Sequence, residues 1–215
     1  MIRTLFGGLL GGLALFLTGF VFWGTPLANI GYTTAEPAAS TNLQAALAQT
    51  LTQTGTGVYL IPSTTTSEGT ILYGKGPIAQ VFFNTSGYPS LDSSALIGGL
   101  ILALVVGVLI ALALRLIAGD TATRVRATVA FAMAAVLWMH VGQPIFNHAP
   151  WGYFLYFAFS DFVGIVLAGL IAAKLMTDTP ATVAAAPVTP APKYTDTTDS
   201  NSFGSPLRTD NDPLP

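Results

Sequence analysis

Residues 151–174 have the sequence WGYFLYFAFSDFVGIVLAGLIAAK, a long apolar run with one acidic residue, Asp161, inside it. At about 1.5 Å per residue, a helix of this length spans a bilayer core of roughly 30 Å and puts Asp161 about 15 Å from the Trp151 end. A carboxylate inside the bilayer costs about 2.5–3.5 kcal/mol on insertion scales. We therefore expect Asp161 to face protein or water and not lipid.

Small residues recur along the same run at helical spacing. Asp161 shares one predicted helix face with Ala158, Gly164, Ala168 and Ala172. Such a face lets a second helix approach closely. The spacing predicts that this run packs against a neighbouring helix.

The composition indicates an integral membrane protein. Of the 215 residues, 52% are hydrophobic and 8% are charged, whereas soluble domains carry about a quarter charged residues. The chain has no cysteine, which excludes disulfides, iron–sulfur clusters and thiolate metal sites. It has no block of basic residues, so we expect no nucleic-acid partner.

Three further apolar runs precede the one described. They cover residues 4–23, 95–114 and 127–143, and we expect Gln143-Pro144 to end the third and shortest. The first run is too long for a signal peptide and lacks a good cleavage sequence, so an uncleaved helix is favoured over that alternative. Gly7/Gly11 and Gly8/Gly12 form two overlapping G-x-x-x-G pairs in it, typical of close helix packing.

The predicted fold is an all-α membrane bundle of four transmembrane helices with a small extracytoplasmic α+β insertion and a disordered C-terminal tail. Helix 1 falls in residues 1–27, the inserted cap in 28–93, helices 2–4 in 94–176 and the cytoplasmic tail in 177–215. The tail has too few large apolar residues to build a core.

The cap is expected to contain one helix and three strands. Leu43, Leu47 and Leu51 recur every four residues after Ser40, which predicts an amphipathic helix with Ser40 as its N-cap. Residues 58–61, 70–73 and 78–83 have strand-like composition. A hydrophobic core of this size gives only marginal stability by itself. We therefore expect the cap to pack against the helices or against a partner.

The distribution of basic residues predicts the orientation. With four spans, Arg3, Arg115, Arg124, Arg126 and Lys174 flank helix ends on one side, and only Lys75 lies on the other. The positive-inside rule then puts both termini in the cytoplasm and the cap outside, most simply across a bacterial inner membrane.

Three polar residues fall near the outer half of the spans: Thr18, His140 and Asp161. Thr18 is at a depth that allows a hydrogen bond to the fourth span. His140 is expected nearer the surface, so a direct pair with Asp161 needs a tilt or an offset between helices. Such a group is either a proton or ion site or a buried carboxylate that holds the bundle together.

The remaining chemistry is sparse. His140 and His148 are eight residues apart across a proline-containing turn, which matches no metal motif, so we predict no metal site and leave a pigment or other cofactor open. The sequence has no G-x-S-x-G, H-E-x-x-H or P-loop, and we predict no catalytic residues and no enzyme.

Residues 57–62, GVYLIP, and 76–83, GPIAQVFF, set between a first span and three more, resemble a loose group of small uncharacterised bacterial inner-membrane proteins. The resemblance covers roughly residues 1–175 and implies no activity.

The expected function is that of a non-catalytic accessory or assembly subunit of a larger membrane complex, because small-residue faces occur on three spans. The expected partners are lipid and other membrane subunits or a second copy. Two alternatives stay open: a small ion- or proton-coupled transporter that uses Asp161, and a cap that binds an extracytoplasmic ligand or envelope partner.

Overall fold

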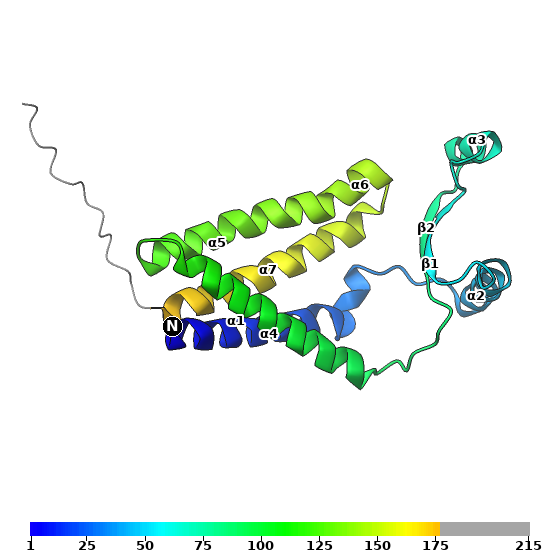
Figure 1. The fold of residues 1–215 in the computed structure, drawn as a ribbon. Helices are drawn as coiled ribbons and strands as arrows, with labels where there is room; N and C mark the ends of the chain where they lie inside the picture. The colour runs from blue at the N-terminus through cyan, green and yellow to red at the C-terminus, as the bar shows by residue number, and fades with distance from the viewer. Residues whose placement is uncertain (177–215) are drawn as a thin grey trace, which may run out of the picture. The chain divides into compact units, whose positions relative to one another are not determined.

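The computed structural model describes residues 1–176 and contains four helices long and apolar enough to cross a membrane (Figure 1). They are α1 (Ile2–Trp23), α4 (Ser93–Arg115), the helix Thr121–Asn147 and α7 (Trp151–Leu175). The prediction of four such helices is confirmed, and their insertion in a membrane stays a prediction. The predicted tail lies outside the described residues.

Helix α1 packs against both α4 and α7, and its four buried glycines divide between the two partners. A methyl group on Gly11 would lie 2.6 Å from the carbonyl oxygen of Ala168 in α7. One on Gly12 would lie 2.5 Å from the carbonyl oxygen of Ala103 in α4. Gly7 likewise faces Ala172 of α7, and Gly8 faces Val108 of α4. The two overlapping pairs are therefore two faces, one for each neighbouring helix.

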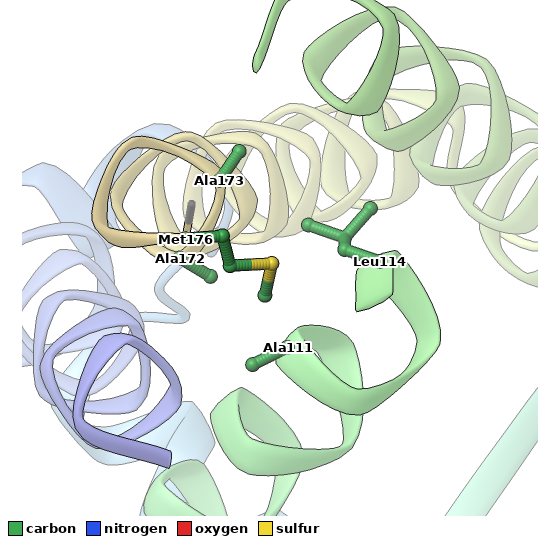
Figure 2. Close-up of a cluster of buried hydrophobic side chains, with 5 residues drawn as sticks. All are labelled: Ala111, Leu114, Ala172, Ala173 and Met176. Carbon is green, nitrogen blue, oxygen red and sulfur yellow. The ribbon is translucent and has the colours of Figure 1, made fainter. Parts of the chain in front are cut away.

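The core near the start of α1 is made from small side chains of α4 and α7. Figure 2 shows the side chain of Met176 reaching from the end of α7 toward Ala111 and Leu114 of α4. Ala172 and Ala173, both fully buried, complete the cluster. Because alanine and glycine dominate these contacts, the helix backbones lie close together.

The third span is longer than predicted. It consists of α5 (Thr121–Val136), a π-helical turn η2 (Leu137–Val141) and α6 (Gly142–Asn147). The expectation that Gln143-Pro144 ends it is wrong, as is the start at residue 127. Pro144 lies in the first turn of α6, directly after the π turn, where the regular backbone ladder is already interrupted and a missing N–H costs little.

Aspartate side chains cap the N-termini of two of these helices. Asp92 caps α4, and hydrogen bonds from the Ser94 hydroxyl and the Ala95 backbone N–H hold the pKa of Asp92 below its ordinary value of 3.8. Asp120 caps α5 in the same way, and the Thr123 hydroxyl and backbone N–H lower the pKa of that carboxyl. These bonds satisfy backbone donors that a helix start leaves without partners.

The segment between α1 and α4 contains a 3-10 turn η1 (Pro26–Ile30), α2 (Pro37–Leu51), β1 (Gly57–Ile61), α3 (Ser67–Lys75) and β2 (Ala79–Phe83). The strands form one antiparallel two-stranded sheet in which Val58 pairs with Phe82. The strands predicted at 58–61 and 78–83 are confirmed within a residue.

Two details of this segment differ from expectation. Residues 70–73 lie in helix α3 and not in a strand, because the Thr66 hydroxyl caps the helix and Glu68 and Lys75 complement its two ends. Helix α2 begins at Pro37, with Glu36 and not Ser40 at its N-cap, because proline suits the first helical position.

Candidate functional site

The buried face of the third span is a stripe with a polar residue near each end, Arg124 and His140. Every fourth residue from Arg124 to Pro144 is buried; the members between them are Thr128, Ala132, Val136 and His140. Helix α5 lays this stripe along α7, where a methyl group on Gly169 would overlap the side chain of Thr128. The stripe therefore presents His140 to α7 near the end of the bundle from which the inserted segment leaves.

His140 meets Asp161 directly. Its Nε2 lies 2.8 Å from Oδ2 of Asp161, within hydrogen-bond distance. The imidazole also stacks on Phe157, one helical turn before Asp161, with ring centroids 4.3 Å apart. Phe157 and Asp161, on consecutive turns of α7, thus both contact the side chain of His140 in η2. The predicted obstacle of unequal depth is absent because the third span extends to Asn147 and the π turn lies at His140.

The two members of the pair differ in exposure. The side chain of His140 is 9% exposed, whereas that of Asp161 is 41% exposed. The small residues of the predicted face, Gly164 and Ala168 among them, are buried, and Gly164 faces Leu15 and Thr18 of α1. Asp161 therefore turns from the α1 contact toward η2, with one side on His140 and the other open at the surface of the chain.

A carboxylate that is hydrogen-bonded to an imidazole can exchange a proton with it. Among residues 1–176, no three His, Asp or Glu side chains come together, so the pair offers two metal ligands at most.

Thr18 does not make the predicted bond to α7. Its hydroxyl donates to the carbonyl oxygen of Ala14 in its own helix, 2.8 Å away, a common use of threonine in apolar helices. The hydrogen bonds between α1 and α7 lie nearer the end of α1. Trp23 Nε1 donates to Ser160 Oγ at 3.1 Å, and the Tyr156 hydroxyl donates to the carbonyl oxygen of Phe22 at 2.8 Å.

His148 lies near His140 along the surface and is not its partner. It ends α6 in a left-handed conformation with φ 53°. Both histidines line a cleft of about 760 Å³, together with Gln143 of α6 and with Leu60 and Phe82 of the sheet. His140 thus lines a cleft at the end of the bundle from which the inserted segment leaves, although Asp161 is not among the lining residues.

The sheet presents an apolar face. Alternation along the two strands puts Val58, Leu60, Gln80 and Phe82 on one side. All four are exposed, and Phe82 is 79% exposed. Between residues 24 and 92 only Gly69 is buried. The inserted segment therefore has no hydrophobic core of its own.

Sequence reasoning missed three parts of this arrangement. It did not name Phe157 as the ring under His140, Trp23 and Ser160 as an interhelical bond, or Arg124 as the opposite end of the buried stripe. The four-residue spacing from Arg124 to His140 was a usable signal, because these positions share one helix face.

Comparison of the chain with protein-family models, with curated proteins and with solved structures gives no match. The class of protein therefore rests on the fold, which is a mostly helical chain with four candidate membrane-spanning helices and a small two-stranded sheet.

Proposed function

We propose that this protein is a non-catalytic accessory subunit of a membrane complex, and that its inserted segment binds the partner. The observation that carries the proposal is the apolar sheet face formed by Val58, Leu60 and Phe82. Four helices anchor the segment, and the predicted orientation puts it outside the cytoplasm.

The low stability expected of an isolated two-stranded sheet supports this proposal. A two-stranded sheet is marginal in water without further strands or a helix packed on it. Burial of one large apolar side chain contributes about 1.5–3 kcal/mol, so covering this face with a partner stabilises both the sheet and the complex. Exposed apolar patches of this kind are typical of interaction sites.

The partner we propose is a polypeptide that adds an extended strand. Neither β1 nor β2 has a second neighbouring strand among residues 1–176, so each offers an edge with backbone hydrogen-bonding groups. A strand added there gains backbone hydrogen bonds, and its alternate side chains reach the apolar face.

The small-residue faces support packing within the chain more than they support the subunit proposal. Gly7 and Gly11 are covered by α7, and Gly8 and Gly12 are covered by α4. The exposed sheet face of the inserted segment, and not the small-residue helix faces, is therefore the reason to expect a partner.

Site-specific crosslinking in the full-length protein tests the proposal. A photoreactive amino acid at Phe82 is expected to give one defined adduct with a second protein in native membranes. The same amino acid at Ile71, also exposed and apolar but on α3, is the matched control and is expected to give little. Equal labelling at both positions, or adducts with lipid alone, would refute a binding face on the sheet.

A second substitution separates binding from folding. Phe82→Asp is expected to abolish recovery of the partner while the protein still reaches the membrane at its normal level. Ile71→Asp adds the same charge to the same segment and is expected to leave recovery unchanged. A partner retained by Phe82→Asp would exclude this face as the interface.

The hydrogen bond between His140 and Asp161 favours a second candidate, a small proton- or ion-coupled transporter. A carboxylate in a membrane helix marks an ion or proton pathway by default, and π turns often occur at functional sites. In this candidate His140 exchanges protons with the outer cleft and Asp161 with the inner half of the pathway.

Proteoliposomes loaded with a pH-sensitive dye distinguish the two candidates. The transporter candidate requires a proton flux that Asp161→Asn abolishes without loss of expression. His148→Gln, at the same cleft but outside the pair, is the control and leaves the flux intact. Loss of expression in Asp161→Asn would instead favour a structural role for the carboxylate.

A further inference from the structure

The end of the bundle opposite the histidines carries a second, differently built cleft. Figure 1 shows the start of α1, the end of α4, the start of α5 and the end of α7 together at this end. A cleft of about 520 Å³ lies among them, and arginines from three different helices line it: Arg3 of α1, Arg115 of α4 and Arg124 of α5.

One of these arginines is deeply buried. Arg124 is 1% exposed, and one of its contacts is a hydrogen bond from Nε to the carbonyl oxygen of Ile117, 3.4 Å away. Thr4, also buried, lines the same cleft and adds a hydroxyl group. Met176, which packs on Ala111 and Leu114 in Figure 2, closes one side with an apolar wall.

The lining has the character of an anion site. Guanidinium groups bind phosphate oxygens through two parallel hydrogen bonds, and Arg3 and Arg115 bring two such groups to the cleft. The cleft lies at the ends of the four apolar helices, which would be the level of lipid headgroups once these helices cross a membrane. Basic pockets between such helices are suited to the headgroups of anionic phospholipids.

We propose that this cleft binds the phosphodiester of an anionic phospholipid, with Arg3 and Arg115 holding the phosphate. The acyl chains then lie along the apolar surface of α1 and α4. This site is separate from the proposed partner site, and neither depends on the other.

Titration of the detergent-purified full-length protein with phosphatidylglycerol tests the site, with the lipid-bound fraction read by native mass spectrometry. Arg3→Gln and Arg115→Gln are each expected to weaken binding about fivefold, the effect of one basic residue near an anionic headgroup. Arg3→Lys and Arg115→Lys keep the charge and are expected to restore most of the affinity.

Arg126→Gln is the matched control, because Arg126 lies at the same end of α5, is exposed and does not line the cleft. It removes the same charge and is expected to leave the affinity unchanged. If Arg126→Gln weakens binding as much as the cleft variants do, binding is non-specific attraction and the proposal is wrong.

Two further arms identify the source of the anion. Phosphatidylcholine, which carries the same phosphodiester with a compensating cation, is expected to bind weakly and without dependence on Arg3 or Arg115. Inorganic phosphate is expected not to displace phosphatidylglycerol at equal concentration. Full displacement by inorganic phosphate would overturn the lipid assignment in favour of a soluble anion.

Discussion

At the scale of single residues, the pair of His140 and Asp161 shows how a long apolar helix accommodates an acid. The hydrogen bond of 2.8 Å and the stack of His140 on Phe157 give the carboxylate a polar neighbour, while the small residues of α7 serve the contact with α1. Polar contacts between membrane helices contribute modestly, about 0.6 kcal/mol on average and about 1.7 at most.

A double-mutant cycle tests that pair. His140→Ala and Asp161→Ala are expected to be non-additive in the free energy of unfolding, with a coupling of about 0.6–1.7 kcal/mol, because each removes the same bond. Unfolding in mixed micelles of increasing sodium dodecyl sulfate gives the measurement. His148→Ala combined with Asp161→Ala is the control and should be additive. Additivity in both cycles means that the bond contributes nothing in the membrane-like environment.

Asp92 provides a pH-dependent prediction outside the spans. Its pKa in the folded protein lies below 3.8, so its stabilising effect is present above 3.8 and is lost as the pH falls through the folded value. Asp92→Ala is therefore expected to lower the melting temperature at neutral pH, by an amount that shrinks in acid. Glu36→Ala, at an N-cap without a side-chain bond, should change little at either pH. A melting-temperature gap for Asp92→Ala that is constant with pH would contradict this role.

At the scale of elements, helix α1 organises the bundle because glycine lets it touch two neighbours at once. Gly107 of α4 lies directly against this helix, and a methyl group there would overlap the backbone of Gly8 and Gly12. A helix with larger residues at these positions would stand farther from α4 and α7, and the alanine contacts near Met176 would open.

Gly107→Ala tests this close approach. It is expected to destabilise the bundle by about 1–3 kcal/mol, because the backbones must separate to admit the methyl group. Gly98→Ala, on the same helix with open space around it, is the control and should be neutral or stabilise by up to about 1 kcal/mol. The same micelle titration measures both. Equal effects of the two substitutions would mean that α1 and α4 do not pack in this way.

At the scale of the whole molecule, basic residues are concentrated at one end of the helices, and the inserted segment connects to the other end. Arg3, Arg115, Arg124, Arg126 and Lys174 all flank helix ends on the side where the chain begins, and Lys75 lies in the inserted segment. The positive-inside rule converts this asymmetry into an orientation.

Reporter fusions check that orientation. An enzyme that is active only outside the cytoplasm is expected to be active when inserted at Gly87 and inactive when joined to Pro215. A fluorescent protein that folds only in the cytoplasm is expected to give the reverse pattern. The same activity from both positions would contradict a four-span topology.

The number of apolar helices, two of the strands and the small-residue face of α7 were predictable from the sequence. Each depends on residues near one another in the chain, and hydrophobic length or spacing expresses them directly. Several local predictions failed, and two of them show why. Strand-like composition at residues 70–73 was outweighed by the cap at Thr66, and the expected stop at Pro144 was removed by the π turn before it.

By itself, the sequence determined a chain with four long apolar helices, because burial of apolar surface depends on composition and period. Only the tertiary structure decided that Gly7 and Gly11 face α7 while Gly8 and Gly12 face α4, that His140 reaches Asp161, and that three arginines share one cleft. These are contacts between different helices, and they depend on register and rotation, which side chains set only when the helices pack together.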